Sequence, residues 1–149
     1  MRLDGKVAIV TASTRGIGLA CTQRLAREGA TVYMAARNME RAENRAKELN
    51  DEGCNVKTVY NDATEKETYT SMVEEVFKNE GRIDILVNNF GTSNPQKDLD
   101  IKNTEYDEYI RTVDINLASV FMTSQAAIPH MAANGGGSII NISSIGGLR

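Results

Sequence analysis

The 149-residue chain has only two cysteines, no long apolar run and no excess of positive charge, and each deficit excludes a class of protein. Cys21 and Cys54 stand far apart, so we expect no disulfide framework, and a reducing cytoplasm is the simplest location. No apolar run approaches the roughly 20 residues that a membrane-spanning helix needs. The net charge of −3 gives no electrostatic reason to expect nucleic acid or an anionic membrane as a partner.

The chain also lacks segments that would divide it or direct it elsewhere. Residues 1–5 lead straight into an apolar strand pattern, so we expect no signal peptide. The "NGGGS" stretch at 134–138 is too short to separate domains, and we expect residues 1–149 to form a single domain. His130, the only histidine, has no cysteine or carboxylate at ligand spacing, so no metal site is expected.

Five short apolar runs predict the strands of a parallel sheet. Each run is nearly continuous rather than alternating with polar residues, as expected for strands that helices cover on both faces. The runs lie at 7–10, 31–36, 56–60, 83–87 and 138–142.

The segments between these runs have the spacing of helices. The clearest is 69–77, whose apolar residues form one stripe at helical spacing, and a similar stripe lies within 39–49. Three helices stop at the dipeptide Glu-Gly (28–29, 52–53 and 80–81), where glycine can adopt the left-handed conformation that ends a helix. Strand, helix, glycine and strand therefore recur. This rhythm predicts an α/β fold of the Rossmann type, a doubly wound parallel sheet with about five helices. Because such sheets often continue to six or more strands, we expect this one to be truncated after the fifth.

The stretch "TASTRGIG" at 11–18 follows the first predicted strand and opens a helix. At that place Gly16 and Gly18 would let the backbone approach a pyrophosphate, and the following helix would present its first N–H groups to the anion. The alternative is a flexible strand-to-helix connection. Its position in a βαβ unit favours a dinucleotide site.

The end of the second strand indicates which dinucleotide is bound. An acidic residue there suits the ribose hydroxyls of NAD, but the strand ends with Ala36 followed by Arg37. Arg15, in the turn itself, could reach the same 2′-phosphate. Two guanidinium groups at one place favour NADP, although both arginines could also be ordinary surface residues.

Four motifs in this order resemble those of the short-chain dehydrogenase/reductase family. They are "TASTRGIG", "NNFG" at 88–91, Asn116 within "DINLAS", and "NISS" at 141–144. Within the family, "TASTRGIG", "DILVNNFG" and "AAIPHM" together look most like bacterial NADP-dependent hydroxysteroid dehydrogenases that act on the 7α position of bile acids. The resemblance implies an oxidoreductase that exchanges a hydride between NADP and a secondary alcohol or ketone.

The resemblance also implies the residues of the site. The cofactor-binding residues would be Ser13, Thr14, Arg15, Gly16, Ile17, Gly18, Arg37, Asp62, Ala63, Asn88 and Gly91. Among them, residues 16–18 would line the pyrophosphate, the two arginines would hold the 2′-phosphate, and Asp62 would lie beside the adenine. The 88–91 motif would stabilise the central strand and border the cofactor. The catalytic residues would be Asn116, which supports a proton-relay water, and Ser144, which bonds the substrate oxygen, with Ser143 as its neighbouring alternative.

The sequence departs from the family pattern in three places. Ala12 replaces a glycine, which is harmless only if its φ is negative. Phe90 replaces a small alanine and could narrow the pocket or stack on a flat substrate. The Tyr-x-x-x-Lys pair, which transfers the proton in the family, is absent from these 149 residues. We therefore expect the intact protein to be the enzyme and the 149-residue chain alone to be inactive.

A second hypothesis is a non-catalytic nucleotide-binding or assembly module. In the family, the helix leading out of "DINLAS" packs against its counterpart in another subunit of a dimer or tetramer. The apolar spacing of Val120, Phe121, Ala127, Ile128 and Met131 suits such a homo-oligomer, or equally the sheet. Tyr106 and Tyr109 fit a packed helix and are not promoted to the missing general acid.

Overall fold

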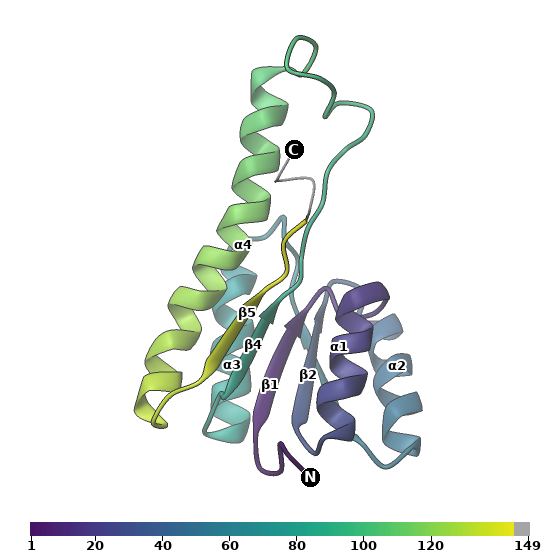
Figure 1. Ribbon diagram of the computed structural model, residues 1–149, viewed down its shortest axis with the longest axis vertical. Helices are drawn as coiled ribbons and strands as arrows, with labels where there is room; N and C mark the ends of the chain where they lie inside the picture. The colour runs from purple at the N-terminus through teal and green to yellow at the C-terminus, as the bar shows by residue number, and fades with distance from the viewer. Residues whose placement is uncertain (145–149) are drawn as a thin grey trace.

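The computed structural model describes residues 1–144 and contains a five-stranded parallel sheet with helices on both faces (Figure 1). The elements in chain order are β1 (Val7–Thr11), α1 (Gly16–Arg27), β2 (Thr31–Ala36), α2 (Met39–Asp51), β3 (Asn55–Tyr60), α3 (Glu67–Glu80), β4 (Ile85–Asn88), α4 (Tyr106–Ala133) and β5 (Ser138–Asn141). The strands lie in the order β3-β2-β1-β4-β5, and every adjacent pair is parallel. The doubly wound α/β fold predicted from the sequence is confirmed.

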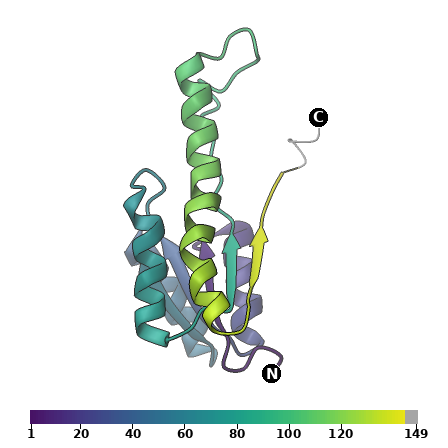
Figure 2. The ribbon, with the colours of Figure 1, turned by 90° about the vertical axis from the view of Figure 1, so that its left-hand side faces the viewer.

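The near-continuous apolar strands contribute side chains to two separate cores, because successive residues of a strand point to opposite faces of the sheet. Val7 and Ile9 of β1 pack with Met72 and Val76 of α3 on one face. Ala8 and Val10 of the same strand belong to the core under α1 and α2 on the other face. Figures 1 and 2 show the two layers, with α1 and α2 on one side and α3 and α4 on the other. A sheet that helices cover on both faces has little room for polar residues in its strands, which explains the uninterrupted apolar runs.

The strand order fixes where a ligand can enter. The chain proceeds from β1 outward to β3 and then crosses back through α3, so that β4 pairs with the other side of β1. The connections after β1 and β4 therefore leave in opposite directions. In open α/β sheets this switch point forms the ligand crevice, at the carboxyl ends of the strands. The residues after Thr11 and after Asn88 border it.

The ends of the elements agree closely with the sequence pattern. Gly29, Gly53 and Gly81 all have positive φ, as expected for glycines that terminate helices. The fourth strand begins at Ile85, two residues later than predicted, and the side chain of the preceding Asp84 accepts a hydrogen bond from Val7 N–H at the start of β1. The described residues contain four helices rather than about five, and the last of them, α4, is continuous over 28 residues.

The apolar residues of α4 divide between two environments. Ala127 and Met131 are buried against the sheet, whereas Phe121 and Ile128 lie on the outside with exposed fractions of 64% and 52%. The sheet interpretation is thus confirmed for Ala127 and Met131, and the homo-oligomer interpretation stays a prediction. In the described residues, no helix combines the length and apolar character needed to cross a membrane.

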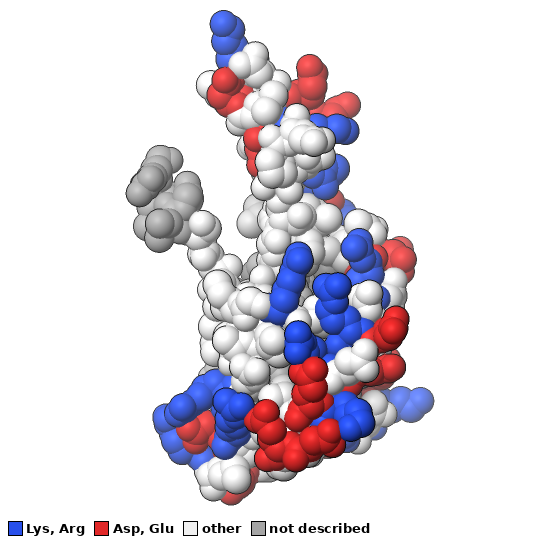
Figure 3. Space-filling model, turned by 90° about the vertical axis from the view of Figure 1, so that its right-hand side faces the viewer, with Lys and Arg blue, Asp and Glu red and all other residues white. Residues whose placement is uncertain are grey.

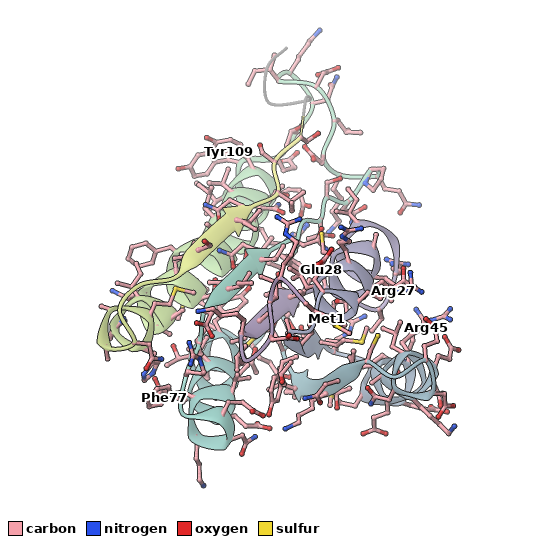
Figure 4. The ribbon with its side chains drawn as sticks, turned by 60° about the horizontal axis from the view of Figure 1, so that its bottom comes forward. Met1, Arg27, Glu28, Arg45, Phe77 and Tyr109 are labelled. Carbon is pink, nitrogen blue, oxygen red and sulfur yellow. The ribbon has the colours of Figure 1, made fainter. Side chains whose placement is uncertain are left out.

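The expectation that Tyr106 and Tyr109 belong to a packed helix is wrong for these two side chains. Their exposed fractions are 71% and 55%, and Tyr109 projects from the upper part of α4 (Figure 4). The reason is visible in Figure 2, where the first turns of α4 extend well above the strands and the other helices. No sheet lies beneath this segment, so apolar spacing there cannot produce burial.

His130, at the other end of α4, has a structural role. Its ring stacks on Phe77 of α3 with the centroids 3.9 Å apart, and its Nε2 lies 2.9 Å from Glu74 Oε1. Figure 4 shows Phe77 near the end of α4. The contact joins the two helices that cover this face. Among residues 1–144, no group of three histidine, cysteine or acidic side chains is placed to hold a metal ion.

Asp84 connects the starts of β1 and β4 at the amino-terminal ends of the strands, opposite the crevice. Its carboxylate accepts hydrogen bonds from Val7 N–H at 2.9 Å, Lys6 Nζ at 3.1 Å and Arg82 Nε at 2.8 Å. Burial by itself raises the pKa of Asp84, but these bonds outweigh burial and lower the pKa from 3.8 to about 2. The folded state therefore favours the ionised form.

We expect Asp84→Asn to lower the free energy of unfolding by about 2 kcal/mol at pH 7. The folded pKa lies below the unfolded one, so this stabilisation is fully present above about pH 4 and is lost as the pH falls toward 2. Urea unfolding at pH 7 and pH 3 measures the difference, which should narrow at the lower pH. Asp4→Asn, at an exposed ion pair with the amino terminus, is the control and should change little. An unchanged stability for Asp84→Asn would contradict the assignment.

Candidate functional site

Residues 12–15 form the predicted phosphate-binding turn, called the phosphate turn below, which leads from β1 into the amino terminus of α1. The helix begins at Gly16, and the N-cap residue Arg15 is extended, with no side-chain capping hydrogen bond in the described structure. The first N–H groups of a helix have no partner inside it, and their positive end favours an anion. Gly16 has φ +56, and no atom lies within 4 Å of the position that a Cβ would take. The backbone is therefore open to a phosphate at this point.

Gly18, in contrast, is closely packed against the residues that follow β1 and β4. A Cβ on Gly18 would lie 2.5 Å from Ala12 O, 2.6 Å from Asn89 Nδ2 and 2.9 Å from Ser13 Cα. Two of these three atoms belong to the backbone and cannot move aside without rearranging the turn. The two glycines predicted from the sequence thus have different roles, one keeping the outer surface open and the other allowing close packing beneath.

Ala12 does not meet the condition under which it would be harmless. Its φ is +50, the only positive value for a non-glycine residue in the part of the chain that the structure describes. An L-residue in this conformation costs about 1–2 kcal/mol, because its Cβ approaches the backbone carbonyl. The turn therefore keeps the left-handed geometry of the family's glycine in spite of the alanine side chain.

We expect Ala12→Gly to raise the free energy of unfolding by about 0.5–1 kcal/mol. The gain from removing the Cβ is partly offset by the greater freedom of glycine in the unfolded chain. Chemical denaturation at neutral pH measures this change in the free energy of unfolding. The matched control is Ala20→Gly on the exposed side of α1, which should be destabilising by about 0.5–1 kcal/mol. Destabilisation by both variants would show that Ala12 is not strained.

The predicted turn residues other than the glycines differ in exposure. Ser13 is fully buried, with its Oγ 3.5 Å from Ala35 O of β2. Thr14 is half-buried, and Ile17 is 61% exposed in the first turn of α1. Ser13 therefore anchors the turn to the sheet, while Arg15 and Ile17 lie on the surface that a ligand would meet.

The second group of predicted residues follows β2 and β3, which end side by side. The side chain of Arg37 is 74% exposed, and its Nε lies 3.8 Å from Asp62 Oδ2. Asp62 is buried, and its Oδ1 accepts hydrogen bonds from the N–H and the hydroxyl of Thr64. The carbonyl of Ala63 accepts a hydrogen bond from the Tyr69 hydroxyl. Asp62 is thus held in place while the guanidinium group of Arg37 can still reach solvent or a ligand.

Positive side chains gather on the side of the molecule formed by α1 and α2. Figure 3 shows a group of lysine and arginine side chains in the middle of this face, with acidic side chains below them. Such a local excess of positive charge attracts a phosphate group even though the whole chain is acidic.

Asn88, at the end of β4, connects three elements. Its Nδ2 donates to Asn141 Oδ1 at 2.9 Å and to Ser124 Oγ at 3.2 Å, and its Oδ1 accepts from Thr123 Oγ1 at 2.7 Å. The side chain is 3% exposed. Its amide therefore joins β4, β5 and α4 near the crevice, where a buried side chain must have partners.

Asn116 lies on α4 beside the segment that follows β4. Its Oδ1 accepts a hydrogen bond from Thr92 N–H at 2.8 Å, and its Nδ2 donates to the carbonyls of Thr92 at 2.7 Å and Thr112 at 2.8 Å. A Cβ on Gly91 would lie 3.7 Å from Asn116 Oδ1, an ordinary contact. The amide of Asn116 thus pairs with the backbone of Thr92 much as a neighbouring strand would.

The two serines of "NISS" lie at the carboxyl ends of the strands, as do the residues that follow β4. Ser143 and Ser144 follow β5 and are exposed, and the preceding Ile142 N–H donates to Asn88 O at 2.9 Å. This bond places the serine segment beside the end of β4. Residues 145–149 of the predicted single domain lie outside the described residues.

Thr11 and Asn89 belong to the site but were not predicted. The Thr11 hydroxyl accepts hydrogen bonds from the N–H groups of Asn89 and Phe90, and Asn89 Nδ2 donates to the carbonyls of Thr11 and Ala12. The threonine and the second asparagine stand inside the quoted motifs. Their pairing across 78 positions could not be read from either motif alone.

A cavity of about 420 Å³ lies elsewhere, between the segment before α4 and the first turns of that helix. Its lining residues are Asp98, Leu99, Asp100, Ile101, Thr104, Tyr106 and Tyr109. None of the predicted cofactor-binding or catalytic residues is among them.

A family model described as short chain dehydrogenase matches residues 6–149, nearly the whole chain. The chain belongs to the short-chain dehydrogenase family. It is 54% identical over 145 residues to a 7alpha-hydroxysteroid dehydrogenase of Clostridium sardiniense, and 48% identical over 144 residues to one of Paraclostridium sordellii. A solved gluconate 5-dehydrogenase from Burkholderia cenocepacia, in complex with NADP and tartrate, superposes with a TM-score of 0.87 at 38% identity.

These short-chain dehydrogenases are longer than the chain. The alignments cover 97% of this chain in all three cases, but only 55%, 54% and 55% of the three relatives. The chain therefore spans about half the length of the relatives it matches. The described fold and the resemblance to the 7alpha-hydroxysteroid dehydrogenases concern this portion.

Proposed function

We propose that the protein containing this chain is an NADP-dependent oxidoreductase that exchanges a hydride with a secondary alcohol or ketone. The observation that carries the proposal is the open phosphate turn at the switch point of the sheet, next to a strand that ends with Ala36 and is followed by Arg37. An acidic residue for the ribose hydroxyls of NAD is missing there, and an exposed guanidinium group takes its place.

The geometry of the turn fits the cofactor. The space over Gly16 would receive the pyrophosphate, and the first N–H groups of α1 would bind its oxygens. Arg15 and Arg37 would pair with the 2′-phosphate, and Asp62 and Ala63 would lie beside the adenine. Bound NADP(H) would supply the hydride that is exchanged with the carbinol or carbonyl carbon.

The residues after β4 and β5 would hold the reacting part of the substrate. Ser144, with Ser143 as the neighbouring alternative, would donate a hydrogen bond to the substrate oxygen, where charge develops during the transfer. Asn116 would support a proton-relay water, and its bonds to Thr92 fix this part of α4 beside the end of β4. Phe90, half-buried just after β4, would offer an aromatic surface to the substrate.

We further propose a hydroxysteroid such as a bile acid as the substrate. The similarity to two 7alpha-hydroxysteroid dehydrogenases, at 54% and 48% sequence identity, supports this class of substrate. A flat, apolar substrate also suits an aromatic wall at Phe90.

The same proposal extends to location and assembly. We place the protein in the cytoplasm and expect it to form a dimer or tetramer through the outer face of α4. The exposed Leu117, Phe121 and Ile128 form an apolar patch on that helix, which supports an interface.

The test is reduction of a 7-ketosteroid by the complete gene product, followed by the loss of NADPH absorbance. We expect turnover with NADPH and much slower turnover with NADH at equal concentration. A non-steroidal ketone of similar polarity is the control for the substrate class. Tight NADPH binding without turnover of any ketone would instead favour a nucleotide-binding or assembly module.

We also propose that the 149-residue chain does not turn over by itself, because it lacks a Tyr-x-x-x-Lys pair to move the proton. Measurable NADPH-dependent ketone reduction by this chain would contradict that proposal.

A further inference from the structure

The ends of β1 and β4 are fastened by a reciprocal set of hydrogen bonds. In one direction, the Thr11 hydroxyl accepts from Asn89 N–H at 2.9 Å and from Phe90 N–H at 3.1 Å. In the other direction, Asn89 Nδ2 donates to Thr11 O and Ala12 O, each at 3.2 Å. The first pair aligns the strand ends, whereas the second acts on the backbone of the phosphate turn itself.

Ala12 gives the second pair of bonds a particular importance. Its carbonyl accepts a hydrogen bond from Asn89 Nδ2, yet its positive φ is unfavourable for a residue with a Cβ. A glycine would adopt it readily without help. In this chain the alanine keeps this conformation, and the Asn89 amide is bonded to its carbonyl.

Gly18 completes the arrangement. The site of its missing Cβ is bounded by Ala12 O and by Asn89 Nδ2, at 2.5 and 2.6 Å. The Asn89 amide is thus enclosed between the left-handed residue and the first turn of α1. A change at Asn89 would be transmitted to both sides of the phosphate turn.

We propose that Asn89 is a positioning residue for the cofactor, which holds the phosphate turn in its binding geometry by compensating for the alanine at position 12. The inference rests on the proposed binding of NADP(H) at this turn. Because the turn would bind the pyrophosphate, which NADPH and NADH share, the loss of Asn89 weakens binding of both, and NADPH loses at least as much as NADH because Arg15 of the same turn would also hold its 2′-phosphate.

The experiment measures the dissociation constants of NADPH and NADH for the complete protein at a temperature where circular dichroism shows each variant folded. Asn89→Ala should raise both constants by about tenfold. Ala12→Gly alone supplies the reference constants for the second background. In the Ala12→Gly background, Asn89→Ala should raise them by no more than about threefold, because glycine needs less support at this φ.

Asn50→Ala is the matched control. Asn50 also bonds to backbone groups through its amide, with Nδ2 donating to Val56 O and Oδ1 accepting from Val56 N–H, but at the turn between α2 and β3. It should lower the melting temperature without changing either dissociation constant. If Asn89→Ala behaves in the same way, or has equal effects in the unaltered and the Ala12→Gly backgrounds, the proposal is overturned.

If Asn89→Ala does not fold, folding restored by Ala12→Gly supports the proposal, and failure in both backgrounds overturns it. Absence of NADPH binding by the unaltered protein is a separate result. It contradicts the proposed function and removes the basis of this inference with it.

Discussion

Gly18→Ala is expected to lower the affinity for NADPH and NADH by at least about 100-fold, which corresponds to about 2.8 kcal/mol. The new methyl group would lie 2.5 Å from Ala12 O and 2.9 Å from Ser13 Cα, both parts of the turn that would bind the pyrophosphate. Relief of the clash requires the turn and the start of α1 to separate, which displaces the N–H groups from the phosphate position. The loss should be large for both cofactors, since both carry the pyrophosphate, and at least as large for NADPH, since Arg15 of the same turn would also pair with the 2′-phosphate.

The control for Gly18→Ala is the same substitution at Gly53. No atom lies within 4 Å of a Cβ there, and φ is +87, so the variant carries backbone strain but no clash. We expect Gly53→Ala to lower stability by about 1–2 kcal/mol and to leave cofactor affinity unchanged. Titration calorimetry with each cofactor makes the comparison. Gly18→Ala with the affinity of the unaltered protein would show that the turn does not bind the pyrophosphate.

Arg37→Asp is expected to reverse the preference between the two cofactors. It removes one charge-assisted partner of the 2′-phosphate and introduces a carboxylate that repels it, so NADPH affinity should fall by about 100-fold. NADH has no phosphate at this position, and its affinity should change by less than about threefold. The change in ratio, measured by fluorescence titration of the two reduced cofactors, distinguishes this variant from Gly18→Ala.

Arg27→Asp makes the same change of charge at the carboxyl-terminal end of α1. Arg27 pairs with Glu52 at the surface, and Figure 4 shows it beside Glu28 near the amino terminus of the chain. We expect neither cofactor to be affected there, because exposed charges at a distance are screened. Equal losses of NADPH and NADH affinity in Arg37→Asp would remove the argument for NADP from this residue.

The residues of the phosphate turn illustrate how far local pattern reaches. Gly16 and Gly18 could be selected from "TASTRGIG" because their position after a buried strand restricts what a glycine pair there can do. The conformation of Ala12 could not be predicted in this way, since the residues around it in the sequence permit either sign of φ. What holds it positive is the Asn89 amide, 77 positions away.

Helix α4 shows the same limit at a larger scale. The spacing of Ala127, Ile128 and Met131 predicted a helix with an apolar surface, and that prediction is confirmed. Which of them would face the sheet depended on the path of α4 across β4. The exposure of Tyr106 followed from the length of the helix, which extends past the last layer that could cover it (Figure 2).

By itself, the sequence determined the α/β architecture, the order of strands and helices along the chain, the helix ends at Gly29, Gly53 and Gly81, and the place of the phosphate turn. Each of these follows from burial on both faces of a strand or from the conformation of single residues, interactions that act within a few positions of the chain. The tertiary structure alone decided the left-handed Ala12, its contact with Asn89, and the pairing of Asn116 with Thr92. Those features arise where segments far apart in the chain meet at the sheet edge, and a hydrogen bond between them exists only once the strand order has brought its two partners together.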